Sequence, residues 1–272
     1  MNKGSVSLPN FFRSHPIFTS EELAAFLKDR GSPHPRNRES LVRYHRDRGA
    51  IFQIRKGLYC SLPLGVSAKD CPVDSYLLAS KLASDAVLAY HSALDVYGRS
   101  YSVQQRIVYI TLKAPAGASF NFRGTTYRAV SPPKQLGGRE PEVQHLDRGG
   151  QQLRVTTLER TLVDVLDRPR LSGGWEEIWR SLEMIPYLDL DHLIQYALLL
   201  KKRTTIARVG FYLMQHREPL MVEEEHLKRL REHRPGSPKY LTSDPAISGR
   251  LIPEWNLIVP ESVIKKSWEE PT

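Results

Sequence analysis

The sequence is poor in cysteine, and its two cysteines form no familiar metal or redox motif. Cys60 and Cys71 are not part of a C-x-x-C pair, so the sequence indicates neither a zinc finger nor a redox dithiol. A stable disulfide requires an oxidising compartment, and no hydrophobic signal core precedes the chain's first predicted helix. We therefore expect a cytoplasmic protein with reduced thiols.

Long apolar runs and the motifs of common enzymes are also missing. The longest purely apolar run is residues 196–200, whereas a transmembrane helix needs about 20 such residues. The chain has no Gly-rich phosphate loop, no H-E-x-x-H and no G-x-S-x-G, which are the signatures of several enzyme classes. We predict no membrane partner, no enzymatic activity, no metal site and no cofactor.

Positive charge is abundant and unevenly distributed. The chain has a formal net charge of +9 and a pI near 9.5. Residues 1–65 contain eleven Lys or Arg and five Asp or Glu, so this quarter of the chain carries +6 of the total. Attraction for a polyanion such as DNA is therefore concentrated in the N-terminal quarter.

The N-terminal quarter also has the sequence pattern of a helix-turn-helix. A short helix is expected over residues 8–12. Thr19 and Glu22 have the spacing of a capping box, and they begin a second helix. Breaking residues at 31–35 end that helix, and a third follows from about residue 36 to 48, with Gly49 as its C-cap.

Two short apolar runs, residues 51–54 and 58–62, follow at once and predict a β-hairpin. A three-residue loop at 55–57, with Gly57 at positive φ, would pair Phe52 with Cys60 and Ile54 with Leu58. These four side chains would then share the buried face, and Arg55 and Lys56 would lie at the tip. Helix, turn, helix and hairpin in this order predict a winged helix-turn-helix.

The third helix presents one arginine-rich side. At 100° per residue, Leu41, Tyr44 and His45 fall on the inner side, with Val42 at its margin. The outer side is either a surface that enters a DNA major groove or a merely solvated charged face. We favour the first interpretation, because a hairpin with a basic tip follows directly. We expect Arg36, Ser40 and Arg43 to contact base edges and Glu39 to accept a hydrogen bond from a cytosine amino group. Phosphates are expected to be held by Arg46, Arg55 and Lys56, with Arg38 in the same interface.

The rest of the chain predicts a larger mixed α/β domain, so we expect an α+β fold with domains at 1–65 and 66–272. Residues 63–72 read as a linker because they contain two prolines, a glycine and little periodicity. Strands are expected at 86–90, 106–113, 120–122, 125–130, 143–146 and 153–155, and helices at 73–82, 91–97, 156–166, 175–185, 189–201, 205–216 and 222–233. The tail from residue 234 is rich in proline, with one expected strand at 257–259.

Three residues of this larger domain, His91, Asp95 and Asp164, have side chains that could serve a catalytic or a structural role. His91 and Asp95 are spaced i, i+4 on a helix, which favours a hydrogen-bonded structural pair over a catalytic one. Asp164 lies between two valines in an apolar helix, which fits a buried structural acid. Asp164 is also open to a second interpretation, in which Asp164, Asp167 and Glu176 form a metal-dependent nuclease site addressed by the winged helix.

A third interpretation treats the predicted middle sheet and its helices as a protein-interaction module. Most of their aliphatic side chains are explained by a simple hydrophobic core.

Several segments in this order resemble the AbiEi-type antitoxins, which are transcriptional regulators of phage-defence (abortive infection) toxin–antitoxin systems. The segments are G-A-I-F-Q-I-R-K-G-L-Y, A-Y-H-S-A-L-D-V-Y-G, E-R-T-L-V-D-V-L-D-R-P and R-V-G-F-Y-L. The resemblance implies an N-terminal winged helix that binds inverted repeats in its own promoter, double-stranded DNA, and represses the operon. It further implies a C-terminal antitoxin domain that counters a nucleotidyltransferase-like toxin, with direct binding left open.

Overall fold

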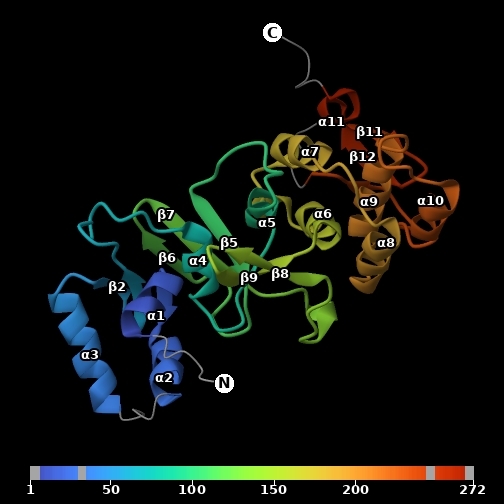
Figure 1. Cartoon of the computed structure of the whole chain (residues 1–272). Coiled ribbons are helices and arrows are strands. Elements are labelled where there is room, and N and C mark those ends of the chain that lie inside the picture. Colours follow the sequence, from blue (N-terminus) through green and yellow to red (C-terminus); the bar gives the residue numbers. More distant parts are fainter. Residues whose placement is uncertain (1–6, 30–34, 243–248, 267–272) are drawn as a thin grey trace, which may run out of the picture.

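The computed structural model describes residues 7–29, 35–242 and 249–266, and it has an α+β fold. The N-terminal unit, residues 7–61, lies at one end of the molecule, and helices α6 to α11 lie toward the other (Figure 1). Its elements are α1 (Leu8–Ser14), β1 (Ile17–Thr19), α2 (Ser20–Lys28), α3 (Pro35–Asp47), β2 (Ile51–Arg55) and β3 (Leu58–Ser61).

Helix α2 begins with the capping box that the sequence predicts. The Thr19 hydroxyl accepts from the Glu22 amide at 3.2 Å, and the Glu22 carboxylate accepts from the Thr19 amide at 2.8 Å. This capping box satisfies two otherwise unpaired amides at the start of α2. Strand β1 was not predicted. It pairs antiparallel with β3, which gives a sheet of order β1-β3-β2.

The hairpin differs from the prediction at its tip. Phe52 pairs with Cys60 as expected, but Arg55, not Ile54, pairs with Leu58. A bulge between Gln53 and Arg55 absorbs the extra residue, so the turn is shorter than predicted. Gly57 has the expected positive φ, +79°.

Both faces of this small sheet are buried, each in a different core. Phe18 and Tyr59 pack with Phe11 and Leu23 under helices α1 to α3. Their neighbours Ile17 and Leu58 point to the other face and join the core of the C-terminal region. The apolar side of the hairpin that contains Leu58 therefore packs against the rest of the chain, not against the unit's own helices.

A mixed six-stranded sheet occupies the centre of the molecule, in the order β6-β7-β5-β4-β9-β8. Its strands are β4 (Val87–Leu88), β5 (Arg106–Ile110), β6 (Ser119–Phe122), β7 (Thr125–Val130), β8 (Val143–Arg148) and β9 (Gln151–Thr156). Pairing alternates along this order, antiparallel for β6/β7, β5/β4 and β9/β8 and parallel for β7/β5 and β4/β9. The predicted strands are confirmed, with shorter bounds for β4 and β5.

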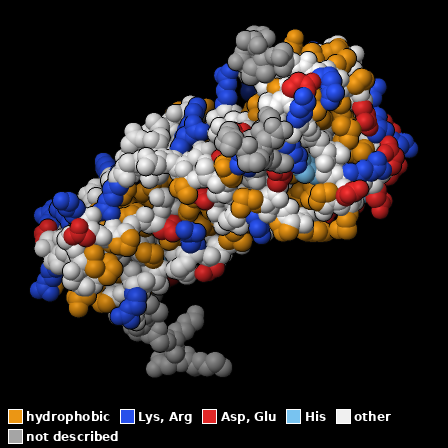
Figure 2. Space-filling view, turned by 90° about the horizontal axis from the view of Figure 1, so that it is seen from above, with side chains coloured by type: hydrophobic (Ala, Val, Ile, Leu, Met, Phe, Trp, Pro, Cys, Tyr) orange, Lys and Arg blue, Asp and Glu red, His pale blue; other side chains and the backbone are white. Residues whose placement is uncertain are grey.

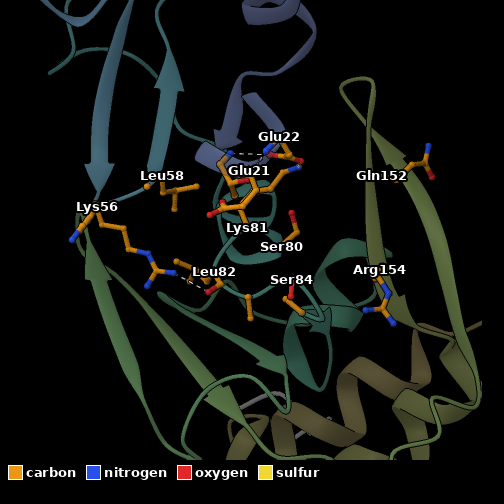
Figure 3. Close-up of a pocket in the computed structure, with 15 residues that line it drawn as sticks. Glu21, Glu22, Lys56, Leu58, Ser80, Lys81, Leu82, Ser84, Gln152 and Arg154 are labelled. Carbon is orange, nitrogen blue, oxygen red and sulfur yellow. Dashed lines mark hydrogen bonds and ion pairs between the residues drawn. The ribbon is translucent and has the colours of Figure 1, made fainter. Parts of the chain in front are cut away.

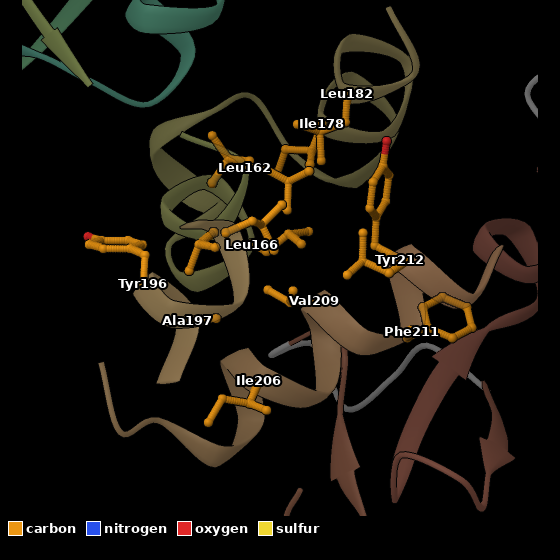
Figure 4. Packing of buried hydrophobic residues seen from close by; sticks show 14 of the residues in the cluster. Leu162, Leu166, Ile178, Leu182, Tyr196, Ala197, Ile206, Val209, Phe211 and Tyr212 are labelled. Carbon is orange, nitrogen blue, oxygen red and sulfur yellow. The ribbon is translucent and has the colours of Figure 1, made fainter. Parts of the chain in front are cut away.

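The alternation of side chains along the central strands places the sheet between two layers. Ile107 and Tyr109 point toward α4 (Ser75–Ser80) and the N-terminal unit. Val108 and Ile110 point to the opposite face and join the larger core. That core includes Leu162, Leu166 and Ile178 of the helical layer (Figure 4). The predicted helices are present as α5 (His91–Val96), α6 (Leu158–Asp167), α7 (Trp175–Glu183), α8 (Leu190–Leu199), α9 (Arg203–Gln215) and α10 (Glu224–Arg231).

The described part of the proline-rich tail contains more regular structure than the one expected strand. The expected strand is β12 (Leu257–Pro260), and it is flanked by β10 (Lys239–Tyr240) and β11 (Gly249–Ile252), with α11 (Glu261–Lys265) after it. Trp255 is fully buried and packs on Gly210 of α9, where an added Cβ would lie 2.2 Å from the indole. The tail is thereby part of the main hydrophobic core.

Among the helices of the described residues, none is long and apolar enough to cross a membrane.

Candidate nucleic-acid interface

A groove of about 620 Å³ lies between α3, the start of α2 and the hairpin turn. We call it the basic groove, and it is lined by Ser20, Glu21, Arg38, Glu39, Val42, Arg43, Arg46, Lys56, Gly57 and Tyr59. The end of the molecule that carries α3 shows several Lys and Arg side chains in the space-filling view (Figure 2). Side chains from three separate elements therefore converge on one concave surface.

Most of the predicted interface residues meet in this groove. Arg38, Glu39, Arg43, Arg46 and Lys56 line it. Ser40 is exposed on α3 but is not part of the lining. Arg36 belongs to α3, and its side chain lies outside the described residues. Glu21 and Tyr59 were not predicted to line this surface, because only the packing of α2 and β3 beside α3 brings them there.

The cations of the basic groove are largely free of internal partners. Arg43, Arg46 and Lys56 are exposed. Within the described part of the chain, Arg46 has only a long ion pair with its neighbour Asp47, 3.9 Å from Nε to Oδ1, and no carboxylate pairs with Arg43 or Lys56. Exposed cations with at most a long ion pair are available to an anionic partner without first breaking a strong contact.

The inner side of α3 is mostly as predicted. Leu41 and Val42 pack on the core of the N-terminal unit, and the His45 ring meets Phe12 edge-on at 5.0 Å. Burial, together with the nearby Arg48 charge, lowers the pKa of His45. The predicted burial of Tyr44 is wrong. Its side chain is 48% exposed, and the Arg48 guanidinium covers its ring at 4.6 Å.

Arg55 turns away from the basic groove. Its Nη2 donates to the Leu82 carbonyl at 2.8 Å, and its guanidinium lies 5.5 Å from the centre of the Phe120 ring. The bulge in β2 changes the direction of this side chain, so Arg55 lines a second hollow on the other side of the turn.

The predicted pairing of His91 with Asp95 is wrong. His91 is buried, and its Nε2 lies 3.0 Å from the Glu177 carboxylate, which can only accept, so the proton is on Nε2. Asp95 instead accepts from Ser100 at 2.9 Å and from Tyr76. Burial lowers the pKa of His91 despite the carboxylate beside it. His91 links α5 to α7, whereas Asp95 links α5 to α4 and to the loop that follows α5.

Asp164 is buried, as its place in an apolar helix predicts. Its carboxylate accepts from Arg160 Nε at 3.2 Å and from the Tyr196 hydroxyl at 2.8 Å. Arg160 is 2% exposed and also donates to the Pro141 carbonyl at 2.7 Å. Burial raises the pKa of Asp164, while the Arg160 charge opposes that shift.

The acids of the nuclease interpretation have separate partners. Asp167 accepts from Lys202 and Thr205, each at 2.6 Å. Glu176 is 56% exposed and pairs with Arg180 at 3.1 Å. Among the described residues, no three His, Cys, Asp or Glu side chains gather as a metal site would require.

The residues that line the basic groove belong to a segment that matches a known protein family. Residues 7–61 match the family described as "Transcriptional regulator, AbiEi antitoxin". The match covers all the elements that form the groove. It bears out, over this N-terminal segment, the resemblance to AbiEi-type antitoxins.

At the level of fold, the chain is similar to a crystal structure of the RV2827C protein from Mycobacterium tuberculosis. The TM-score is 0.61 at 20% identity, over 97% of this chain and 94% of that chain. At this identity the similarity shows a shared fold only. A search of curated proteins found no match.

Proposed function

We propose that the protein is a DNA-binding autorepressor that acts as an antitoxin, with a winged helix-turn-helix over residues 1–65. The observation that carries this proposal is the basic groove, where arginines of α3 and the hairpin lysine face one concave surface. In this proposal α3 is the recognition helix, and the β2–β3 hairpin is the wing beside it. The match of residues 7–61 to a regulator family supports the same function.

Each residue of the interface has a distinct role in this proposal. Arg43 contacts a base edge, together with Arg36 and Ser40 at the start of α3, and Glu39 accepts from a cytosine amino group. Arg38, Arg46 and Lys56 hold phosphates on either side. Arg55 is also a phosphate contact, on the far side of the turn.

The C-terminal region, residues 66–272, is the proposed antitoxin domain. Its functional partner is a nucleotidyltransferase-like toxin, as the resemblance implies. Co-purification with the product of the adjacent gene tests whether the two proteins bind directly.

Gel-shift titration of the full chain against the promoter upstream of its own gene tests DNA binding. Replacing Arg43 by alanine is expected to cost about 1–3 kcal/mol on a specific site, because one base contact is lost. The double variant Arg43→Ala/Lys56→Ala is expected to bind still more weakly.

The matched control is Arg250→Ala/Lys265→Ala, two cations that are 62% and 70% exposed at the other end of the molecule. It removes the same charge and is expected to bind like the unaltered chain. An unchanged affinity in the Arg43/Lys56 variant would refute the proposed DNA-binding interface.

A further inference from the structure

A second hollow adjoins the basic groove at the hairpin turn. It has a volume of about 700 Å³ and lies between the N-terminal unit and the C-terminal region (Figure 3). Glu21, Lys56 and Gly57 line both the hollow and the groove, so the two form one continuous surface around the turn. We call this second site the inter-unit hollow.

The wall opposite the hairpin belongs to the C-terminal region. Gln152 and Arg154 of β9 and Ser84 of the loop after α4 form that wall (Figure 3). Gln152 and Ser84 are exposed. Both have polar groups that donate hydrogen bonds to phosphate oxygens in other protein–DNA interfaces.

The lining of the inter-unit hollow contains four cations, Arg55, Lys56, Lys81 and Arg154, and two acids, Glu21 and Glu22. Lys81 is neutralised by Glu22, which its ammonium contacts directly. The charge of Arg55 is not offset by its hydrogen-bond partner, because that partner is the neutral carbonyl of Leu82, 2.8 Å away. Arg154 is 25% exposed and pairs with Glu140, which is 49% exposed, so a phosphate must compete with this carboxylate for the guanidinium.

We propose that the inter-unit hollow binds the backbone phosphates of the same DNA duplex, with Arg154 of the C-terminal region as a direct phosphate contact. This inference rests on the proposed function. A duplex seated in the basic groove crosses the turn at Lys56, and its next phosphates then face Arg55, Arg154 and Gln152. The DNA footprint therefore extends beyond the winged helix-turn-helix onto the larger domain, which helps to fix the direction in which the duplex leaves the groove.

Salt-dependent binding of the full chain to its promoter fragment tests this contact. Each phosphate contact contributes about 0.9 to the slope of log affinity against log salt concentration. Arg154→Gln is expected to lower that slope by about 0.9 and to weaken binding about eightfold at 0.1 M salt. Arg154→Lys keeps the charge and is expected to keep the slope.

The matched control is Arg250→Gln, which also removes an arginine with an exposed glutamate partner, Glu261 at 3.9 Å. It is expected to leave the slope unchanged. Glu140→Gln provides an independent variant that leaves Arg154 intact, and it is expected to tighten binding because it frees the guanidinium.

The outcomes separate this inference from the proposed function. If Arg43→Ala weakens binding while Arg154→Gln and Glu140→Gln both behave like the unaltered chain, the contact on the larger domain is refuted and the winged-helix interface stands. If the unaltered chain does not bind the promoter at all, the proposed function itself fails. An Arg154→Gln effect with the expected slope change supports the contact.

Discussion

Replacing Asp164 by asparagine tests whether the most buried ion pair of the helical layer is structural. Asp164 is 1% exposed and Arg160 is 2% exposed, with 3.2 Å between Oδ2 and Nε. Asparagine keeps the shape of the side chain but leaves the guanidinium charge buried without a counter-ion. Removing one partner of a buried pair typically costs about 3–5 kcal/mol. We expect the free energy of unfolding of Asp164→Asn to fall by that amount.

The assay is urea unfolding followed by tryptophan fluorescence, since Trp175 and Trp179 lie in the same layer. Glu176→Gln is the control, because Glu176 is 56% exposed in its pair with Arg180. An exposed pair of this kind contributes at most about 1 kcal/mol. A loss below about 1 kcal/mol for Asp164→Asn would contradict the argument, since a charged and desolvated Arg160 cannot be left unpaired so cheaply.

The same variants bear on the nuclease interpretation. Incubating the unaltered chain with DNA or RNA and with magnesium or manganese is expected to give no cleavage. Cleavage that is lost in an Asp164→Asn protein that remains folded would favour a catalytic role for this acid.

Two further predictions follow from packing and titration. Gly210→Ala places a Cβ 2.2 Å from the Trp255 indole, so thermal unfolding is expected to show a loss of roughly 1–3 kcal/mol, whereas Gly236→Ala has no atom within 4 Å of the new Cβ and is expected to have little effect. Burial lowers the pKa of His91 below its ordinary value of 6.5, so the unfolded chain takes up a proton first and stability is expected to fall as pH drops through that value. In His91→Gln this part of the pH dependence should be absent, and equal slopes in both proteins between pH 7.5 and 5.5 would contradict it.

Signals that act within a few residues were readable from the sequence. The capping box of Thr19 and Glu22, the positive φ of Gly57 and the pairing of Phe52 with Cys60 are all present. The arginine-rich outer side of α3 is present as well. Each depends on a local hydrogen bond, on a backbone conformation or on helical periodicity, and these are properties of short segments.

Contacts between distant segments were not readable in this way. The bulge in β2 was not predicted, and with it the Arg55 side chain turns toward Leu82 and Phe120. His91 bonds to Glu177, far along the chain, although Asp95 has suitable helical spacing.

The amino-acid sequence by itself determined the helices, the hairpin and the concentration of positive charge, because those follow from the order of neighbouring residues. Only the tertiary structure decided that the basic groove continues into a hollow walled by Gln152 and Arg154. The physical reason is that both faces of the small N-terminal sheet are apolar, and the second face is buried only by docking on the larger domain. That docking makes the basic groove and the inter-unit hollow one continuous surface.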